Sequence, residues 1–414
     1  MTADEIVARA GAAAGRAHES LATATAAAVR AALESMARRL LTASGPILGA
    51  NAQDVAAAEG GMAAALVDRL RLDAGRLQAM SRQIEELSGL DDAAALVATR
   101  ALPGGLEVRE TRRPVGVIGA NYEARPNVTI DVASQLLKSR NAGVLRTGAA
   151  ALGSARALHQ HVIRPALEEA GIDPDAIQIV RSAEREAARA LVSLPGLIPL
   201  VILRGSGETT AALARHAAAH GVRTLAHAEG GGVLYIDRSA DRARALALVE
   251  RSLDRLGVCN RLNLLLVAEG EWVGWIDDLV GVLERLGVRP SLPPHDHPLG
   301  HEWALDDGAE ATVTLATAEG PRDAARIANA ETSGLAAAIV AEDRAAAEEF
   351  LAAYAGTGAF WNATTRLLDG FALLGAPETG INVDHVPGPR GPVTFRDLHL
   401  RQYVVVPAGR CPEA

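Results

Sequence analysis

The spacing of apolar residues divides the chain into a helical first quarter and a longer α/β remainder. Apolar residues recur at helical spacing through Ile6, Ala10 and Ala13, and again over residues 29–40. Residues 106–111 then alternate as a strand does, and short apolar runs alternate with helical stretches from there to about residue 365. This alternation predicts an α/β fold with doubly wound, mostly parallel sheets, in which ligands bind at the carboxyl ends of the strands.

The same pattern predicts two α/β units followed by a short tail. We expect the N-terminal helices and the first α/β domain to occupy residues 1–255, and the second α/β domain to occupy residues 256–370. In the remaining segment, 371–414, a Pro- and Gly-rich connection leads to the apolar run Tyr403–Val406. A strand there has no local partner, so it must pair with a distant strand or with another subunit.

Composition narrows the class of protein. The 414 residues are 49% hydrophobic but only 3% aromatic, which predicts more than one aliphatic core. A net charge of −9 argues against a nucleic-acid partner. We find no uninterrupted apolar segment of the kind that signal peptides or transmembrane helices need. With two cysteines a disulfide framework is excluded, and the prediction is a cytoplasmic protein without a membrane partner.

Two polar residues are candidates for covalent chemistry. Cys259 follows a helical run and is flanked by Gly257 and Asn260, which suits a nucleophile, although free cysteines more often pack as small apolar residues. Asn127 follows Pro126 in a polar loop, and its amide can donate hydrogen bonds to an oxyanion. The alternative for Asn127 is a turn or helix-capping residue.

Three further segments carry weaker signals. The Arg204–Gly207 turn joins a predicted strand to a predicted helix and suits either a phosphate or a plain turn, although no Gly-x-Gly-x-x-Gly fingerprint is present. Glu229 lies beside three glycines and is either an accessible carboxylate or a solvated turn residue. The three histidines at 295, 297 and 301 lie on a Pro-broken loop without a fourth ligand, so we predict a solvated loop rather than a metal site.

Several long blocks of the chain are similar to one enzyme family. The segments Arg113–Asp131, Leu137–Arg146, Gly257–Asn260 and Asn362–Arg366 resemble γ-glutamyl phosphate reductase (glutamate-5-semialdehyde dehydrogenase), a family of the aldehyde dehydrogenase superfamily. The most specific block is Tyr-Glu-Ala-Arg-Pro-Asn at 122–127, and the resemblance covers nearly the whole chain. It implies two doubly wound domains, the first binding NADP and the second catalytic, plus a small β oligomerisation arm formed near 106–125 and by the C-terminal strand.

The resemblance also implies a reaction and its residues. The family reduces an acyl phosphate, by default L-glutamate 5-phosphate, to the semialdehyde with NADPH in proline biosynthesis. Cys259 would form a thioester, while Asn127 and the Cys259 backbone N–H would hold the oxyanion. The residues implied to bind substrate are Glu123, Arg125, Lys138, Asn260 and Arg366. Those implied to bind the NADPH cofactor are Arg146, Gly205, Ser206, Glu229 and Glu378, and no metal is implied.

The implied partners are a small acyl phosphate, the kinase that would supply it through functional coupling, and further copies of the chain in a homo-oligomer. The chain also departs from the family pattern. A family histidine is replaced by Leu335, residues 230–232 are all glycine, and residues 392–398 differ. One alternative is therefore a paralogous acyl-phosphate reductase of a specialised pathway. Another is a hydrolytic aldehyde dehydrogenase that uses Glu229 to activate water, and a third is a non-catalytic partner that retained the fold.

Overall fold

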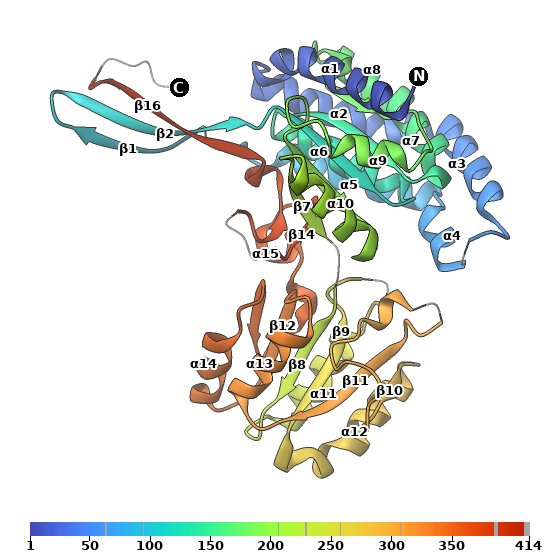
Figure 1. The fold of residues 1–414 in the computed structure, drawn as a ribbon, viewed down its shortest axis with the longest axis vertical. Coiled ribbons are helices and arrows are strands. Elements are labelled where there is room, and N and C mark those ends of the chain that lie inside the picture. Colours follow the sequence, from blue (N-terminus) through green and yellow to red (C-terminus); the bar gives the residue numbers. More distant parts are fainter. Residues whose placement is uncertain are drawn as a thin grey trace.

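Two α/β domains and a projecting β arm make up the molecule (Figure 1). The structure is a computed structural model that describes residues 1–62, 64–93, 95–205, 207–227, 230–256, 258–306, 308–384 and 388–409. Five helices begin the chain, and Thr2, Thr25 and Asp73 cap three of them by accepting a backbone N–H in the first turn. These helices are α1 (Ala3–Ala22), α2 (Ala26–Thr42), α3 (Ser44–Ala58), α4 (Ala64–Leu70) and α5 (Ala74–Gly89).

The first domain is built on a five-stranded parallel sheet in the order β5-β4-β3-β6-β7. Its strands are β3 (Val117–Tyr122), β4 (Ala142–Thr147), β5 (Ile177–Ile179), β6 (Leu200–Arg204) and β7 (Arg223–His227). The strand order reverses between β3 and β6, where Ile118 pairs with Leu200 and Tyr122 pairs with Arg204. In open parallel sheets this reversal creates a crevice beyond the carboxyl ends of the two strands, which is where ligands bind.

Helices cover both faces of this sheet, and each face has its own aliphatic core. Ile118 and Leu145 belong to one core with the N-terminal helices α2 and α5, while Val117 and Val144 belong to the other. The helices that follow α5 in this domain are α6 (Pro126–Lys138), α7 (Leu152–Leu158), α8 (Arg164–Glu169), α9 (Glu186–Leu191) and α10 (Gly207–Ala219). The prediction of a doubly wound α/β domain is confirmed here.

The second domain holds a six-stranded parallel sheet in the order β10-β11-β9-β8-β12-β13. Its strands are β8 (Gly232–Ile236), β9 (Leu262–Ala268), β10 (Arg289–Ser291), β11 (Thr312–Ala318), β12 (Ala336–Val340) and β13 (Gly358–Trp361). The helices are α11 (Arg242–Ser252), α12 (Trp272–Arg285), α13 (Pro321–Glu331) and α14 (Arg344–Ala353).

The predicted boundary at residue 255 is wrong. Strand β8 pairs with β9 and β12, and α11 packs on the second sheet, so the second domain already includes residues 232–255. Only residues 228–231 separate β7 from β8, too few for the crossover that two parallel neighbours in one sheet need, so this spacing itself indicates a change of sheet.

The last part of the chain returns to the first domain. The segment contains α15 (Gly370–Leu374), β14 (Gly380–Asn382) and β15 (Gly391–Val393). Ala376, Val393 and Phe395 lie in the same aliphatic core as the N-terminal helices. This return places residues 376–381 between the two domains, where Glu378 and Ile381 line the cavity described below.

The arm is a three-stranded antiparallel sheet in the order β1-β2-β16, and it extends away from both domains (Figure 1). Its strands are β1 (Leu96–Leu102), β2 (Leu106–Pro114) and β16 (His399–Pro407). The C-terminal strand β16 thus pairs with β2, a distant strand of its own chain. Pairing with a distant strand is one of the two possibilities that the sequence left open. The predicted arm range of 106–125 needs correction, because residues 117–122 form β3 of the first domain and β1 belongs to the arm.

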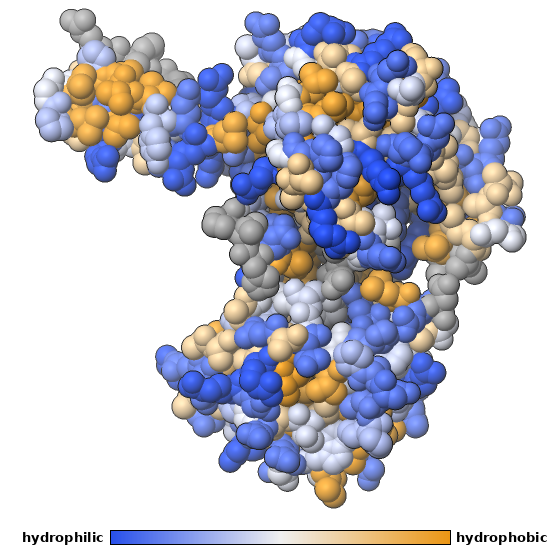
Figure 2. Space-filling model, in the orientation of Figure 1, coloured by the Kyte–Doolittle hydropathy of each residue, from blue (hydrophilic) through white to orange (hydrophobic). Residues whose placement is uncertain are grey.

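Apolar residues gather on the arm, as Figure 2 shows near its tip. Leu400, Tyr403 and Val405 of β16 are each more than half exposed. Exposed apolar side chains on both edge strands of a short sheet favour contact with another protein surface. Among the helices that the structure describes, none is long and apolar enough to cross a membrane.

Candidate active site

The Cys259 loop connects α11 to β9 at the amino end of the second sheet, facing the first domain. The Cys259 carbonyl accepts a hydrogen bond from the Gly231 N–H at 2.7 Å. A side chain at Gly230 would place its Cβ 2.5 Å from the Cys259 carbonyl oxygen, so only glycine fits this approach. The thiol side packs beside the apolar cluster of Leu335 and Ile381. The loop is therefore held closely, while the Cys259 side chain stays partly exposed.

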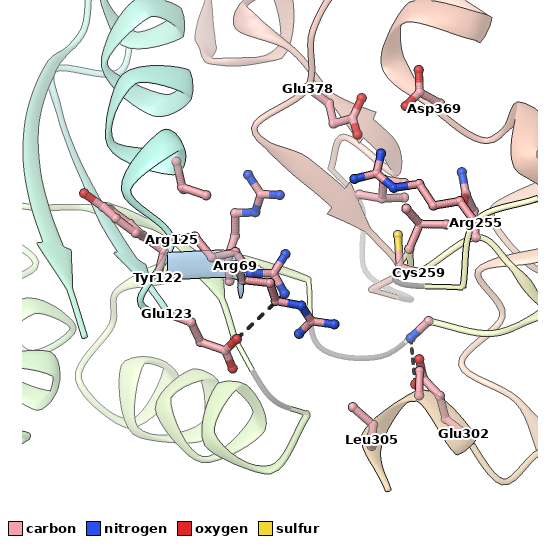
Figure 3. A pocket seen from close by; sticks show the side chains of 18 of the residues that line it. Arg69, Tyr122, Glu123, Arg125, Arg255, Cys259, Glu302, Leu305, Asp369 and Glu378 are labelled. Atoms are coloured by element: carbon pink, nitrogen blue, oxygen red, sulfur yellow. Dashed lines mark hydrogen bonds and ion pairs between the residues drawn. The ribbon is translucent and has the colours of Figure 1, made fainter. Parts of the chain in front are cut away.

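Cys259 opens into a cavity of about 330 Å³ between the two domains. Figure 3 shows Cys259 and Arg255 on one side of this space and Arg69, Arg125 and Glu123 on the other. The first-domain side comes from α4 and from the ends of β3 and β6, which is the crevice expected from the strand order. The cavity thus combines a nucleophile from one domain with a ligand-binding crevice of the other.

Five arginines line this cavity, and they differ in how they are paired. Arg366 donates a hydrogen bond to Asp254 at 2.7 Å and another to the Asn260 side chain. Arg125 reaches Glu123 only at 3.9 Å. Over the described ranges, the side chains of Arg69, Arg204 and Arg255 form neither a hydrogen bond nor an ion pair. A cavity with unpaired cations is suited to an anionic ligand.

Four carboxylates share the cavity with these arginines: Glu123, Glu302, Asp369 and Glu378. The Glu302 side chain accepts the Gly230 N–H at 2.8 Å and so supports the glycine turn against Cys259. Glu378 accepts the Gly370 N–H at 2.5 Å. Burial raises the pKa of Glu378, and the nearby charge of Asp369 raises it further.

The thiol of Cys259 is neutral at pH 7. Burial raises its pKa to about 11, and the negative charges of Glu378 and Glu302 act in the same direction. Arg204 opposes them, because its positive charge favours the thiolate. Arg204 is therefore the described side chain that most favours the reactive form of the sulfur.

A second groove of about 310 Å³ adjoins the cavity and shares Arg69, Arg125 and Arg204 with it. It is largely apolar, with Met62 and Leu66 on its wall. The other lining residues come from the ends of β3, β4 and β6 and the start of α10: Asn121, Tyr122, Glu123, Ala124, Arg146, Gly148, Gly205, Thr209 and Thr210. Helix α10 begins at Gly207 and places its N-terminus at this groove.

Arg146 lies at the end of β4, inside the groove, and is 8% exposed. One terminal nitrogen donates to the Asn121 side chain at 3.1 Å and the other to the Glu184 carbonyl at 3.1 Å. Its Nε is buried without a partner. An unpaired buried donor in a ligand-sized groove indicates a missing acceptor.

Comparisons with known proteins match this architecture. The model of the aldehyde dehydrogenase family matches residues 1–300. γ-Glutamyl phosphate reductase of Clavibacter michiganensis is 36% identical over 412 residues, which cover 96% of this chain and 93% of that protein. The chain therefore belongs to the γ-glutamyl phosphate reductase family of aldehyde dehydrogenases.

Solved structures agree with this membership, and the predicted family and fold class are confirmed. γ-Glutamyl phosphate reductase of Thermotoga maritima superposes with a TM-score of 0.90 at 27% identity, covering 98% of this chain and all of that one. An engineered glycolyl-CoA reductase with bound NADP⁺ shares the fold, with a TM-score of 0.72 at 15% identity and 97% and 96% coverage of the two chains.

The predicted residues of this family member fall into three groups in the structure. Cys259, Asn260, Arg366 and Glu378 line the cavity, Arg146 lines the groove, and Glu123, Arg125 and Gly205 line both. The Asn260 side chain holds the neighbouring backbone in place, because its amide donates to the carbonyls of Arg366 and Leu368 at 3.2 and 2.9 Å. Ser206 and Glu229 lie outside the residues that the structure describes.

Lys138 needs correction as a substrate-binding residue. It ends α6, twelve positions after Pro126, so the helix carries it about 18 Å from the end that faces the cavity. Its ammonium group donates to the Leu90 carbonyl at 2.5 Å, forms an ion pair with Asp92 at 2.9 Å and is 3% exposed. Lys138 therefore anchors the connection that leads to the arm.

Asn127 lies in the first turn of α6, and the neighbouring Val128 lines the cavity. The Asn127 amide donates to Asp131 at 3.1 Å, and Asn127 itself is not among the residues that line the cavity. Its second amide hydrogen has no acceptor within the part of the chain that the structure describes.

The sequence does not identify Arg69, Arg255 and Glu302 as site residues, and Arg204 enters only as the first residue of a candidate phosphate-binding turn. Arg204 ends β6 and opens the predicted turn at 204–207, so its position at the carboxyl end of a strand is a usable signal. Arg69 lies on a short helix far from the other site residues in sequence, and no local pattern connects it to Cys259. Only tertiary packing brings it to the cavity.

Proposed function

We propose that the protein reduces an acyl phosphate, by default L-glutamate 5-phosphate, to the corresponding semialdehyde with NADPH and releases phosphate, as in proline biosynthesis. The observation that carries this proposal is that Cys259 opens into a cavity with unpaired arginines next to an apolar groove. The names of the family members with which the chain aligns support the same reaction.

The chemistry begins at the Cys259 sulfur. The sulfur attacks the acyl carbon, a C–S bond forms, and the C–O bond to the phosphate breaks with its electron pair leaving on the phosphate oxygen. Arg204 favours the thiolate that this attack requires. Asn127 and the Cys259 backbone N–H are the proposed donors to the oxyanion, and the free amide hydrogen of Asn127 supports this role.

The groove fits a nicotinamide dinucleotide. It offers an apolar wall, the N-terminus of α10 and the unpaired Arg146 Nε, which suit a nucleotide's aromatic, phosphate and ribose groups. We propose that Arg146, Gly205 and Ser206 hold this cofactor. We also propose that Glu378 contacts it from the cavity and that Glu229 contributes to its binding. When bound, NADPH supplies the hydride that reduces the thioester. The sulfur then departs as the thiolate and Cys259 is regenerated.

The remaining assignments follow from the same proposal. Glu123, Arg125, Asn260 and Arg366 bind or position the substrate, and the first and second domains carry cofactor and nucleophile respectively. The apolar arm supports assembly into a homo-oligomer. We further propose a cytoplasmic enzyme that is functionally coupled to the kinase supplying its acyl phosphate, because acyl phosphates hydrolyse readily in water.

A specialised acyl-phosphate reductase is the second candidate. Leu335 is fully buried and shares an apolar cluster with Cys259 where the family pattern has histidine. An apolar side chain at this position alters the surroundings of the nucleophile and favours a substrate different from the default.

The deciding experiment is an NADP⁺-reduction assay with glutamate semialdehyde and a panel of other amino-aldehydes, with and without inorganic phosphate. Phosphate-dependent turnover of glutamate semialdehyde is expected. Preference for another aldehyde would support the specialised reductase. Turnover without phosphate would contradict the proposal and indicate a hydrolytic dehydrogenase.

A further inference from the structure

The arginines of the cavity form two groups that come from different domains. Arg69 lies in the last turn of α4, Arg125 precedes α6 and Arg204 ends β6, so the first domain supplies all three. Arg255 and Arg366 come from the second domain. The first group also lines the adjoining groove, whereas the second does not. Figure 3 shows Arg69 and Arg125 facing Arg255 across the cavity.

Pairing distinguishes the first group from Arg366. The contact of Arg125 with Glu123 is 3.9 Å long, and Arg204 acts on Asp131 and Glu378 only through its charge, without a hydrogen bond. Burial lowers the pKa of Arg125, and the positive charges of Arg69 and Arg204 lower it further. Like charges held this close carry a repulsion that a bound anion relieves. Arg366 is instead already bonded to Asp254 and Asn260.

The first group also lies on the reacting side of the nucleophile. Arg204 acts electrostatically on the Cys259 thiol, and Cys259 acts on Arg125. In an acyl phosphate, the phosphate oxygen is bonded to the carbon that the sulfur attacks, and that carbon must approach within about 3.5 Å of the sulfur. The phosphate must therefore lie close to Arg125 and Arg204, whose charges interact with the Cys259 sulfur.

We propose that Arg69, Arg125 and Arg204 form the subsite for the departing phosphate, and that Arg255 and Arg366 face the other end of the substrate. This assignment rests on the proposed function. A phosphate group carries close to two negative charges and accepts several charge-assisted hydrogen bonds, which matches three arginine side chains that have no hydrogen-bonded partner among the described residues. In the reverse direction, an oxygen of inorganic phosphate held there attacks the thioester carbon. The C–S bond then breaks with its electron pair on the Cys259 sulfur.

The test measures phosphate binding without turnover. Cys259 is alkylated with iodoacetamide at rising concentrations of inorganic phosphate and at constant ionic strength, and the modified Cys259 peptide is quantified by mass spectrometry. The variants are Arg69→Met and Arg204→Met, with Arg255→Met as a matched control because it also lacks a partner. Thermal melting confirms folding, and Arg69→Met on the half-buried end of α4 keeps the test valid if Arg204→Met fails to fold.

We expect phosphate to protect the wild-type thiol. Arg69→Met and Arg204→Met should need about 10- to 100-fold more phosphate for half protection, because each variant loses a charge-assisted hydrogen bond to the phosphate. Arg255→Met should stay within about twofold of wild type. Absent protection in the wild type, or loss of protection only in Arg255→Met, would overturn the assignment.

NADP⁺ titrations of the same variants separate the two sources of phosphate. Weakened NADP⁺ binding with unchanged protection by inorganic phosphate would show that these arginines serve the cofactor, and the proposal would be wrong. The proposed function fails by a different result, namely semialdehyde oxidation without phosphate. The two failures are therefore distinguishable.

Discussion

The nucleophile on one wall of the cavity and the first-domain arginines on the other are held in different ways. On the second-domain wall the Cys259 loop is tied down, with its carbonyl bonded to Gly231 and the next residue, Asn260, bonded to the 366–368 segment. On the first-domain wall Arg69 and Arg204 are left without hydrogen-bonded partners within the described residues. A nucleophile gains from a fixed position, whereas a ligand site gains from groups that only the ligand satisfies.

Replacing the nucleophile should have the largest effect on activity. Cys259→Ser should lower the rate of semialdehyde oxidation by more than about 10⁴-fold, because a serine hydroxyl in this buried site is a poor nucleophile and leaving group. Steady-state NADP⁺ reduction measures the loss. Binding of NADP⁺, followed by fluorescence titration, should stay near the wild-type value. Retained turnover would remove Cys259 from the mechanism.

The next test concerns the oxyanion. Asn127→Ala should lower kcat by about 10²–10³-fold if the amide holds the developing charge. Asp131→Asn is the matched control, since its oxygen can still accept the Asn127 hydrogen bond of 3.1 Å. A loss smaller than about tenfold for Asn127→Ala would indicate that Asn127 serves only to hold the first turn of α6.

Asp131 is a buried carboxyl behind the first-domain wall, and its ionisation affects the stability of the protein. Burial raises its pKa to about 6, while Arg204 and the Asn127 hydrogen bond act against the shift. The fold therefore favours the neutral carboxyl, and a cost appears as the pH rises from about 4 to 6. Asp131→Asn should stabilise the protein at pH 7.5 by up to about 3 kcal/mol in chemical unfolding, and the gain should vanish near pH 4. A difference that does not change with pH would contradict this reading.

The smallest expected effect concerns the thiol. Glu378→Gln keeps an acceptor for the Gly370 N–H but removes the charge that, after burial, contributes most to the raised pKa of Cys259. Alkylation of Cys259 at pH 8 should become faster by up to about tenfold, which corresponds to one unit of pKa. Glu302→Gln should give a smaller change in the same direction. Equal rates for Glu378→Gln and wild type would show that burial alone raises the pKa.

Much of this arrangement is predictable from local sequence. The apolar runs at 117–122 and 142–147 become buried strands, and the 122–127 block lies at the cavity because it follows a strand at the sheet's reversal point. Cys259 is recognisable because it is isolated in the sequence and flanked by glycine and asparagine.

Other features depend on tertiary packing. Arg69 is brought to Cys259 by the docking of α4, which no short-range pattern encodes. Lys138 was misassigned because a basic residue on a site helix can lie at either end of it. The predicted domain boundary is too late, because the change of sheet falls between β7 and β8, where only residues 228–231 separate two strands that belong to different sheets.

The central claim is that Cys259 carries the acyl group and that phosphate removes it. The most direct measurement is to incubate the enzyme with NADP⁺ and the aldehyde substrate without phosphate, and to record both NADPH formation and the mass of the Cys259 peptide. We predict a burst of about one NADPH per active site, an acyl group on Cys259, and loss of that group with renewed turnover when phosphate is added. Sustained turnover without phosphate, or an unmodified Cys259 after the burst, would contradict the account.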